Sequence, residues 1–258
     1  MNQQRANKTF TGRYGRSEGG FAGREQQARL RASEEMITAY HQREAELQEQ
    51  MRSAQADISS ISSNLVNMDS IQDYHPSESD GWLNPVSGPT SAGTWYYPGG
   101  GVHLGVDRAV SIGTPIYAPA DGLVVWVANP VGSNSGYLGN WSGYPAGAGN
   151  DIAVLVNVKG TTYFVSFFHM SQEGMTVSVG QSVSQGQLLG LTGNAGNSSG
   201  PHCHIEIINL GSMSITEAAA QFSRTADFSW GCGWSSPATG CDSKGSTPCR
   251  ERPETLIG

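Results

Sequence analysis

The chain has 258 residues, of which 37% are apolar and 14% charged, and its formal net charge is −7. The acidic balance argues against nucleic acid as a partner, and no run approaches the roughly 18 apolar residues that a membrane helix needs. The 34 glycines favour a loop-rich β domain over a helical bundle. Residues 1–20 lack the apolar core of a signal peptide. Either the protein is not exported by that route, or upstream sequence is missing.

The N-terminal part of the chain has two textures. Residues 1–23 are polar and rich in Gly and Arg, so we expect them to be disordered. Between Leu30 and Met68, mostly apolar residues recur at alternating steps of three and four. This heptad pattern predicts a long coiled-coil helix over residues 24–75. Its partner would be a second copy of the chain or an upstream segment. The alternative is an amphipathic helix that packs on the neighbouring domain.

A β domain follows a linker at residues 76–81. From Trp82 to residue 218, short apolar runs alternate with Gly, Pro and Asn, which predicts a mainly β fold built on an antiparallel sheet. The expected strands are 116–118, 122–128, 152–158, 161–168, 176–179, 187–192 and 202–208. A long loop at 132–150 carries three aromatic residues, and we expect it to form the wall of a groove.

Residues 219–258 form a C-terminal extension that contains three of the four cysteines. The spacing of Cys232, Cys241 and Cys249 does not fit a zinc ribbon. One disulfide among them is expected in an oxidising compartment. The sequence does not choose the pair, and a chance occurrence of the three cysteines is the alternative.

Four of the six histidines fall in the β domain, whereas His41 and His75 read as solvated. The stretch GPHCHIEI, residues 200–207, places His202 and His204 on one face of a strand, because strand side chains alternate. The glycine-rich stretch before it leads into a strand rather than a helix, which argues against phosphate binding.

A second histidine motif lies about a hundred residues upstream, where His103 precedes Asp107 by four positions. Together with the H-x-H pair, it supplies two imidazoles and a carboxylate. Three such ligands with one open position describe a catalytic zinc site rather than a structural one.

Three motifs in this order carry a family resemblance: HLGVD (103–107), FFHMS (167–171) and GNSSGPHCHIE (196–206). Residues 82–218 resemble the LytM/lysostaphin-like zinc peptidases, the M23 family of peptidoglycan endopeptidases. The resemblance implies a duplicated hybrid-motif fold, one Zn²⁺ per chain and peptide cross-links of peptidoglycan as the substrate. It also implies a location outside the cell, in the cell wall or in the periplasm, for a bacterial or a phage-encoded protein.

The resemblance also assigns roles by position. It implies that His103, Asp107 and His204 bind the metal. His169 and His202 match the two histidines that act without binding it, one as a base and one as an oxyanion stabiliser, in an order that the sequence does not fix. Tyr97 matches a tyrosine that helps to hold the transition state, although the adjacent tyrosine is an alternative.

Glu206 lies on the same strand face as His202 and His204. It could orient an imidazole by accepting a hydrogen bond from it, and a solvated glutamate is the alternative. Cys203 stands where the family usually has Leu or Val, and it should point away from the metal. The long loop and the C-terminal extension look like additions to the family pattern.

Three functions remain open. The first is an active zinc endopeptidase. The second is a non-catalytic M23-like regulator of cell-wall hydrolysis, and the third is a coiled-coil scaffold. Relatives that only regulate have lost metal ligands, whereas this chain keeps all five histidine and aspartate positions, which favours the enzyme.

Overall fold

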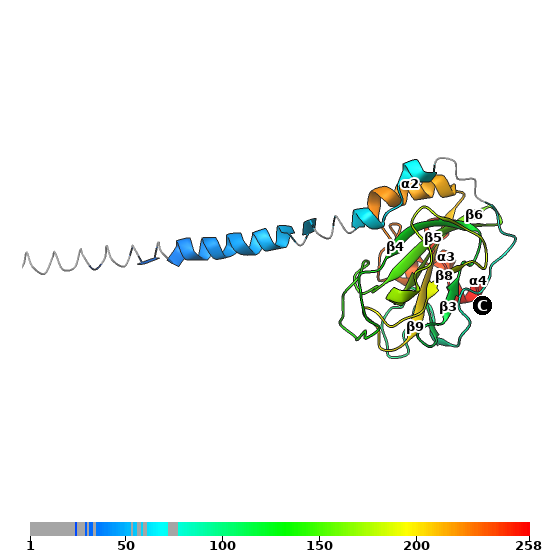
Figure 1. Cartoon of the computed structure of the whole chain (residues 1–258), viewed down its shortest axis with the longest axis horizontal. Coiled ribbons are helices and arrows are strands. Elements are labelled where there is room, and N and C mark those ends of the chain that lie inside the picture. The colour runs from blue at the N-terminus through cyan, green and yellow to red at the C-terminus, as the bar shows by residue number, and fades with distance from the viewer. Residues whose placement is uncertain are drawn as a thin grey trace, which may run out of the picture. The chain divides into compact units, whose positions relative to one another are not determined.

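The computed structural model describes residues 24, 29, 31–32, 35–52, 54–55, 58, 61–71 and 77–258 (Figure 1). The chain divides into two compact units, residues 1–59 and 60–258. The predictions for residues 1–23 and for His75 lie outside the described residues. Among the helices that are described, none combines the length and apolar character that a membrane span requires.

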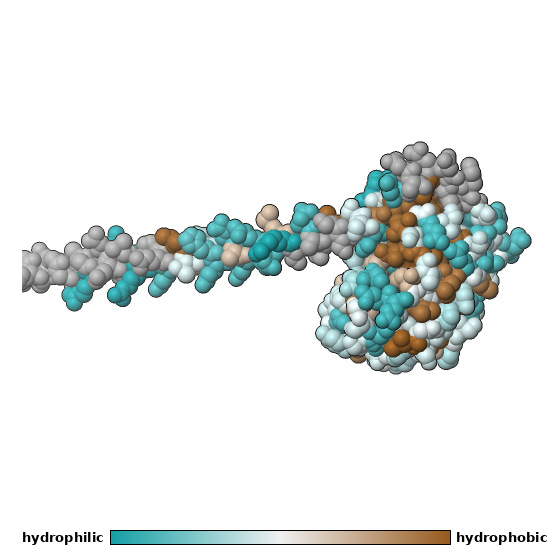
Figure 2. Space-filling model, viewed as in Figure 1, coloured by the Kyte–Doolittle hydropathy of each residue, from teal (hydrophilic) through white to brown (hydrophobic). Residues whose placement is uncertain are grey.

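The first unit contains a helix over residues 35–52. Its surface is largely hydrophilic, with scattered apolar side chains (Figure 2). Tyr40, Leu47 and Met51 are 69%, 44% and 72% exposed. These residues belong to the predicted heptad seam, and their apolar side chains are exposed in this unit. The coiled coil itself stays a prediction.

The second unit begins before the predicted linker. Residues 61–64 are helical, and the 3-10 helix η1 spans Met68–Ile71. Val66 and Ile71 are buried in the core of the β domain, and Leu65 forms a bridge with Trp126. This last part of the heptad pattern therefore packs on the domain, as the alternative interpretation described. The boundary between the two units falls after residue 59 and not at residues 76–81.

An antiparallel sheet of eight strands forms the centre of the second unit, in the order β1-β2-β9-β6-β5-β4-β7 with β10 beside β9. A separate pair joins β3 to β8. The prediction of a mainly β, antiparallel fold is confirmed. The strands are β1 Thr90–Ala92, β2 Val106–Ala109, β3 Pro115–Tyr117, β4 Gly122–Ala128, β5 Asp151–Val158, β6 Thr161–Phe168, β7 Ser182–Val183, β8 Leu188–Leu191, β9 His202–Gly211 and β10 Cys249–Arg250.

The predicted strand at 176–179 is wrong. Ser178 and Gln181 are hydrogen-bonded to each other in a turn there. The segment makes isolated backbone hydrogen bonds to neighbouring strands, such as the one from the amide of Thr176 to the carbonyl of Leu189, and no continuous ladder. The sequence also failed to indicate β1, β2 and β10, which are all four residues or shorter. Strands this short carry too little alternation to be recognised.

The sheet buries both faces. In β9, Cys203, Ile205 and Ile207 face one core cluster, whereas Ile208 and Leu210 face the other. Helix α2, Ile215–Thr225, covers this second face across β4 and β5 (Figure 1). It begins with a capping box between Ser214 and Glu217, and it buries Phe222 against the aromatic side chains of the sheet.

The C-terminal extension belongs to the same fold. Phe228 and Trp230 lie in the core under α2, and β10 pairs with β9. Short elements fill the rest: η2 Gln172–Gly174, η3 Pro237–Thr239, α3 Cys241–Lys244 and α4 Pro253–Leu256. The predicted disulfide is present and joins Cys241 to Cys249, while Cys232 is buried and free.

Candidate metal and active site

The site forms where β2 runs beside β9. In the register of these strands Asp107 stands opposite His204, so backbone pairing alone brings a carboxylate to an imidazole. Gly105 makes this approach possible, because a Cβ at that position would meet the carbonyl oxygen of Ile205 at 2.1 Å. Cys203 is fully buried on the opposite face of the sheet. The thiol therefore points away from the site, as predicted.

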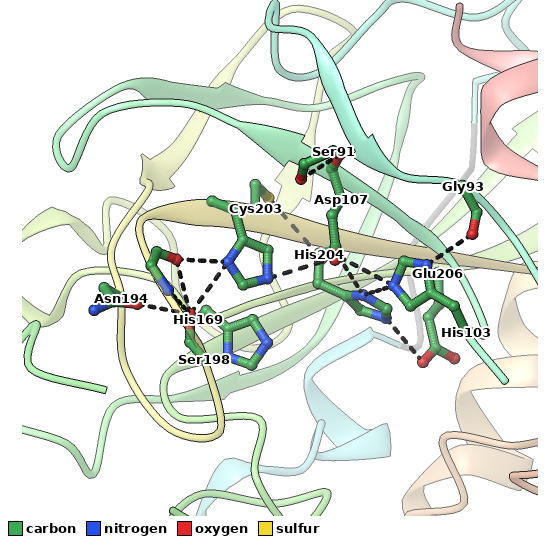
Figure 3. Close-up of polar contacts among 12 residues, drawn as sticks. Ser91, Gly93, His103, Asp107, His169, Asn194, Ser198, Cys203, His204 and Glu206 are labelled. Carbon is green, nitrogen blue, oxygen red and sulfur yellow. Dashed lines mark hydrogen bonds and ion pairs between the residues drawn. The ribbon is translucent and has the colours of Figure 1, made fainter. Parts of the chain in front are cut away.

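Three predicted ligand atoms converge in this corner (Figure 3). Asp107 Oδ1 lies 2.8 Å from His204 Nδ1 and 3.1 Å from His103 Nε2. The two nitrogens are 2.9 Å apart. All three side chains are buried. Two nitrogens and one oxygen are the donor types that zinc prefers, and three protein ligands leave a coordination position for water or substrate.

The other nitrogen of each imidazole is already engaged. His103 Nδ1 lies 2.9 Å from the carbonyl oxygen of Gly93, which can only accept, so Nδ1 carries a proton and Nε2 is the nitrogen that faces Asp107 and His204. His204 Nε2 lies 3.2 Å from Glu206 Oε1. Such outer partners fix the ring orientation and tautomer of metal-binding histidines. The residues present therefore fit a zinc ion.

The charges of the cluster are strongly coupled. Burial alone would raise the pKa of Asp107, but hydrogen bonds from His103 and His204 hold the pKa of that carboxyl well below its usual range. Burial would likewise lower the pKa of His204, yet its hydrogen bonds to Asp107 and Glu206 raise that pKa to about 9. Without a metal, His204 is therefore an imidazolium at neutral pH, clamped between two carboxylates.

His169 and His202 lie beside this cluster with their ring centroids 4.7 Å apart. Their Nδ1 atoms donate to the carbonyl oxygens of Ala195 and Gly200, each at 2.8 Å. Burial lowers the pKa of both, to about 3 for His169. Both rings are therefore neutral at pH 7 with an unprotonated Nε2 that can accept a proton. His202 Nε2 lies 3.6 Å from Asp107 Oδ1.

The backbone of His169 is strained. Its φ is +61°, in the left-handed region that costs a residue with a side chain roughly 1–2 kcal/mol. Its amide donates to the carbonyl of Ala148 at 2.9 Å, which helps to hold this conformation. Strain of this kind concentrates at functional sites, and here it turns the imidazole toward His202 and His204.

Tyr97, rather than the adjacent tyrosine, lies at the site. Its ring centroid is 4.2 Å from that of His103, and Tyr96 is 71% exposed. Burial, followed by the charges of Asp107 and Glu206, raises the pKa of Tyr97 to about 12. The phenol therefore keeps its proton and can donate a hydrogen bond to a developing negative charge.

A cavity of about 380 Å³ opens onto these residues. His169, His204, Glu206 and Tyr97 form its polar wall. Trp141 and residues 145–148 of the long loop form another, as predicted for a groove wall. Trp234 of the C-terminal extension also lines it. The cavity therefore lies directly beside the candidate metal site.

Two residues near the site, Trp234 and Arg250, were not indicated by any sequence pattern. Arg250 is 1% exposed and forms an ion pair with Glu206. Glu206 is thus buried between an imidazole and a guanidinium rather than solvated. Both residues sit in a Gly- and Ser-rich tail, where no periodicity separates a buried Arg or Trp from an exposed one.

Residues 101–215 match the model of peptidase family M23. The chain contains an M23 peptidase domain. It is 38% identical over 109 residues to the peptidoglycan DD-endopeptidase ShyA of Vibrio cholerae serotype O1, a match that covers 42% of this chain and 21% of that protein. It is 31% identical over 151 residues to lysostaphin of Staphylococcus staphylolyticus, covering 57% and 27% of the two chains.

Among solved structures, a zinc-containing peptidase from Vibrio cholerae aligns with a TM-score of 0.38 at 27% identity, over 52% of this chain and 40% of the other. The chain spans about a fifth to a quarter of the length of ShyA and lysostaphin. The M23 match ends at residue 215, before most of α2 and the whole C-terminal extension.

Proposed function

We propose that this protein is a zinc-dependent endopeptidase that hydrolyses peptide cross-links of bacterial peptidoglycan. One zinc ion per chain would be held by His103, Asp107 and His204. The observation that carries the proposal is the convergence of their three donor atoms, within 3.1 Å of one another, in a buried corner that opens onto a cavity. The peptidoglycan endopeptidases among the relatives supply the substrate class.

The metal would supply Lewis acidity, which activates water and polarises the scissile carbonyl. The side chains supply the rest. One of the two neutral imidazoles, His169 or His202, takes a proton from the attacking water and returns it to the departing nitrogen. The other steadies the oxyanion, together with the phenol of Tyr97. The cavity walls hold the peptide so that the scissile carbonyl meets these groups.

The proposed site of action is outside the cytoplasm, where peptidoglycan lies. The disulfide between Cys241 and Cys249 supports this proposal, because disulfides persist in oxidising compartments and are rare in the cytosol.

Purified peptidoglycan, incubated with the zinc-loaded protein and analysed by mass spectrometry, tests the proposal. We expect new peptide termini with intact glycan strands. Two defined peptidoglycans, one with oligoglycine bridges and one with direct D-alanyl–diaminopimelate links, would identify the bond. Zinc binding without any hydrolysis of either material would instead favour the non-catalytic regulator.

A further inference from the structure

The C-terminal extension reaches the candidate metal site at two separate points. It lies outside the M23 match, which ends at residue 215. Arg250 contacts the acceptor that orients His204, and Glu254 contacts the loop that orients His103. In each case, the group that the extension contacts is itself hydrogen-bonded to a candidate ligand, and the ligand differs between the two contacts.

The first contact runs through Glu206. Its Oε1 accepts from His204 Nε2, while its Oε2 is paired with Arg250 Nη1. Arg250 Nη2 donates to the carbonyl of Gly233 at 2.9 Å. The guanidinium carbon also lies 5.5 Å from the ring centroid of Trp234, which lines the cavity. The buried guanidinium of Arg250 therefore contacts both the Glu206 carboxylate, which is hydrogen-bonded to His204, and Trp234 in the wall of the cavity.

Backbone pairing places Arg250 there. In β10, Arg250 stands opposite Ile208 of β9, and the amide of Glu251 donates to the carbonyl of Ile207 at 2.9 Å. The disulfide ends at Cys249, the preceding residue. The segment is thus anchored on both sides of the guanidinium, which limits its freedom to move away from Glu206.

The second contact runs through Thr94. Glu254 accepts from the amide of Thr94 at 3.1 Å and from its hydroxyl at 2.6 Å. Thr94 is 5% exposed and follows Gly93, whose carbonyl accepts from His103 Nδ1. The peptide group between Gly93 and Thr94 therefore links the extension directly to the imidazole of His103.

Stability alone does not account for a buried ion pair. Removing two charges from water costs several kcal/mol per ion, and an apolar pair of similar volume is often as stable. The pair has a different effect on the metal site. It holds the Glu206 carboxylate in one orientation, and this carboxylate in turn orients the imidazole of His204 and the lone pair that would bind the metal.

We infer that the C-terminal extension is a positioning element of the metal site, in which Arg250 orients His204 through Glu206 and Glu254 orients His103 through Thr94. This inference rests on the proposed function, since it concerns the same metal site. It makes Arg250 and Glu254 positioning residues, which contact neither metal nor substrate.

The test measures zinc affinity of the full chain by competition with a chelator at fixed pH and salt. Arg250→Met removes the guanidinium and keeps an apolar stem. Arg252→Met is the matched control, because Arg252 is two residues away and its ion pair with Asp242 is exposed. We expect Arg250→Met to weaken zinc binding roughly 10–100-fold, the usual effect of losing an outer partner, and Arg252→Met to change it less than about twofold, as for an exposed pair.

Two further readings separate positioning from general stability. In the Glu206→Gln background, Arg250→Met should add less than about threefold, because both substitutions break one chain of contacts. The absorption spectrum of the cobalt-substituted protein, which reports ligand geometry, should change in Arg250→Met and stay unchanged in Arg252→Met. Thermal unfolding in chelator identifies variants that do not fold. If Arg250→Met is among them, Arg250→Lys and Glu254→Gln carry the test, each expected to weaken zinc binding more than the control does.

Equal zinc affinity in Arg250→Met and Arg252→Met would overturn the inference. So would a double variant in which Arg250→Met weakens zinc binding by the same factor in the Glu206→Gln background as in the wild type. Both results leave the proposed function intact if the wild type binds zinc and cuts peptidoglycan. A wild-type protein that binds no zinc would remove the proposed function, and the inference with it.

Discussion

Zinc binding should depend steeply on pH around neutrality, because the metal must displace a proton from His204. Without metal, the Nδ1–H of His204 points at Asp107 and its Nε2–H at Glu206, and these contacts raise its pKa to about 9. Only Nδ1 faces His103 and Asp107, so this nitrogen must lose its proton before it can bind a metal.

The magnitude follows from the fraction of His204 that is deprotonated. For a pKa of about 9 this fraction is roughly 1% at pH 7 and roughly 10% at pH 8. Zinc affinity should therefore rise about tenfold over that unit and level off above pH 9. An unperturbed histidine, with a pKa near 6.5, would give a change of only about 1.3-fold.

The assay is chelator competition at constant ionic strength, corrected for the chelator's own protonation. Glu206→Gln is the informative variant. It removes one of the two carboxylates that raise the pKa of His204, so the rise between pH 7 and pH 8 should become clearly smaller. A wild-type affinity that is constant within twofold over this interval would refute the reasoning, since it would mean that His204 is already neutral at pH 7.

The same coupling predicts how the metal-free protein responds to pH. The raised pKa of His204 contributes stability that is fully present below its unfolded-state pKa near 6.5 and is lost as pH rises through 9. A shift of this size corresponds to something on the order of 3 kcal/mol. Chemical unfolding in chelator should therefore show a lower free energy of unfolding at pH 10 than at pH 7, and zinc should reverse much of that loss.

Three further predictions concern the other residues. Asp107→Ala and His204→Ala should lose both zinc, measured by metal analysis, and hydrolysis. His169→Ala should keep its zinc and slow hydrolysis by about 10²–10⁴-fold. Full activity of His169→Ala would show that this imidazole takes no part in the reaction. Tyr97→Phe should retain zinc and lower kcat by roughly 10-fold or more, with Tyr96→Phe as an unaffected control; equal rates for the two variants would remove Tyr97 from the mechanism. The helix over 35–52 should self-associate, so that Leu47→Lys shifts the mass seen by light scattering toward the monomer without changing zinc content; a wild-type monomer at high micromolar concentration would contradict this.

The H-x-H motif illustrates what the sequence could predict about the site. Strand side chains alternate between the two faces of a sheet. The spacing of His202, His204 and Glu206 by two residues was therefore enough to predict that they share one face. The pairing of Asp107 with His204 could not be derived in this way. It depends on β2, a four-residue strand, and only the family resemblance indicated that the two motifs meet.

The C-terminal extension shows where sequence patterns carry no information. Arg250 is fully buried although it lies among charged and polar residues, and its partner Glu206 is 44 residues away. A buried charge is defined by its partners, and those partners come from β9 and from Gly233. Similarly, the heptad pattern continued through Ile61 and Leu65 because packing against a sheet and packing against a second helix both select apolar residues at the same spacing.

The costs in this structure bear on the choice between an enzyme and a non-catalytic relative. His169 is held at a φ of +61°, which costs roughly 1–2 kcal/mol, and the pair of Glu206 and Arg250 is buried at a further desolvation cost. Both costs fall within the same site. A non-catalytic protein that only bound a partner through this domain would be more stable with an unstrained backbone at His169 and with an apolar pair in place of Glu206 and Arg250. The presence of both costs together is expected if an imidazole must stand free beside a metal whose ligands are rigidly oriented, which is the requirement of a hydrolytic site.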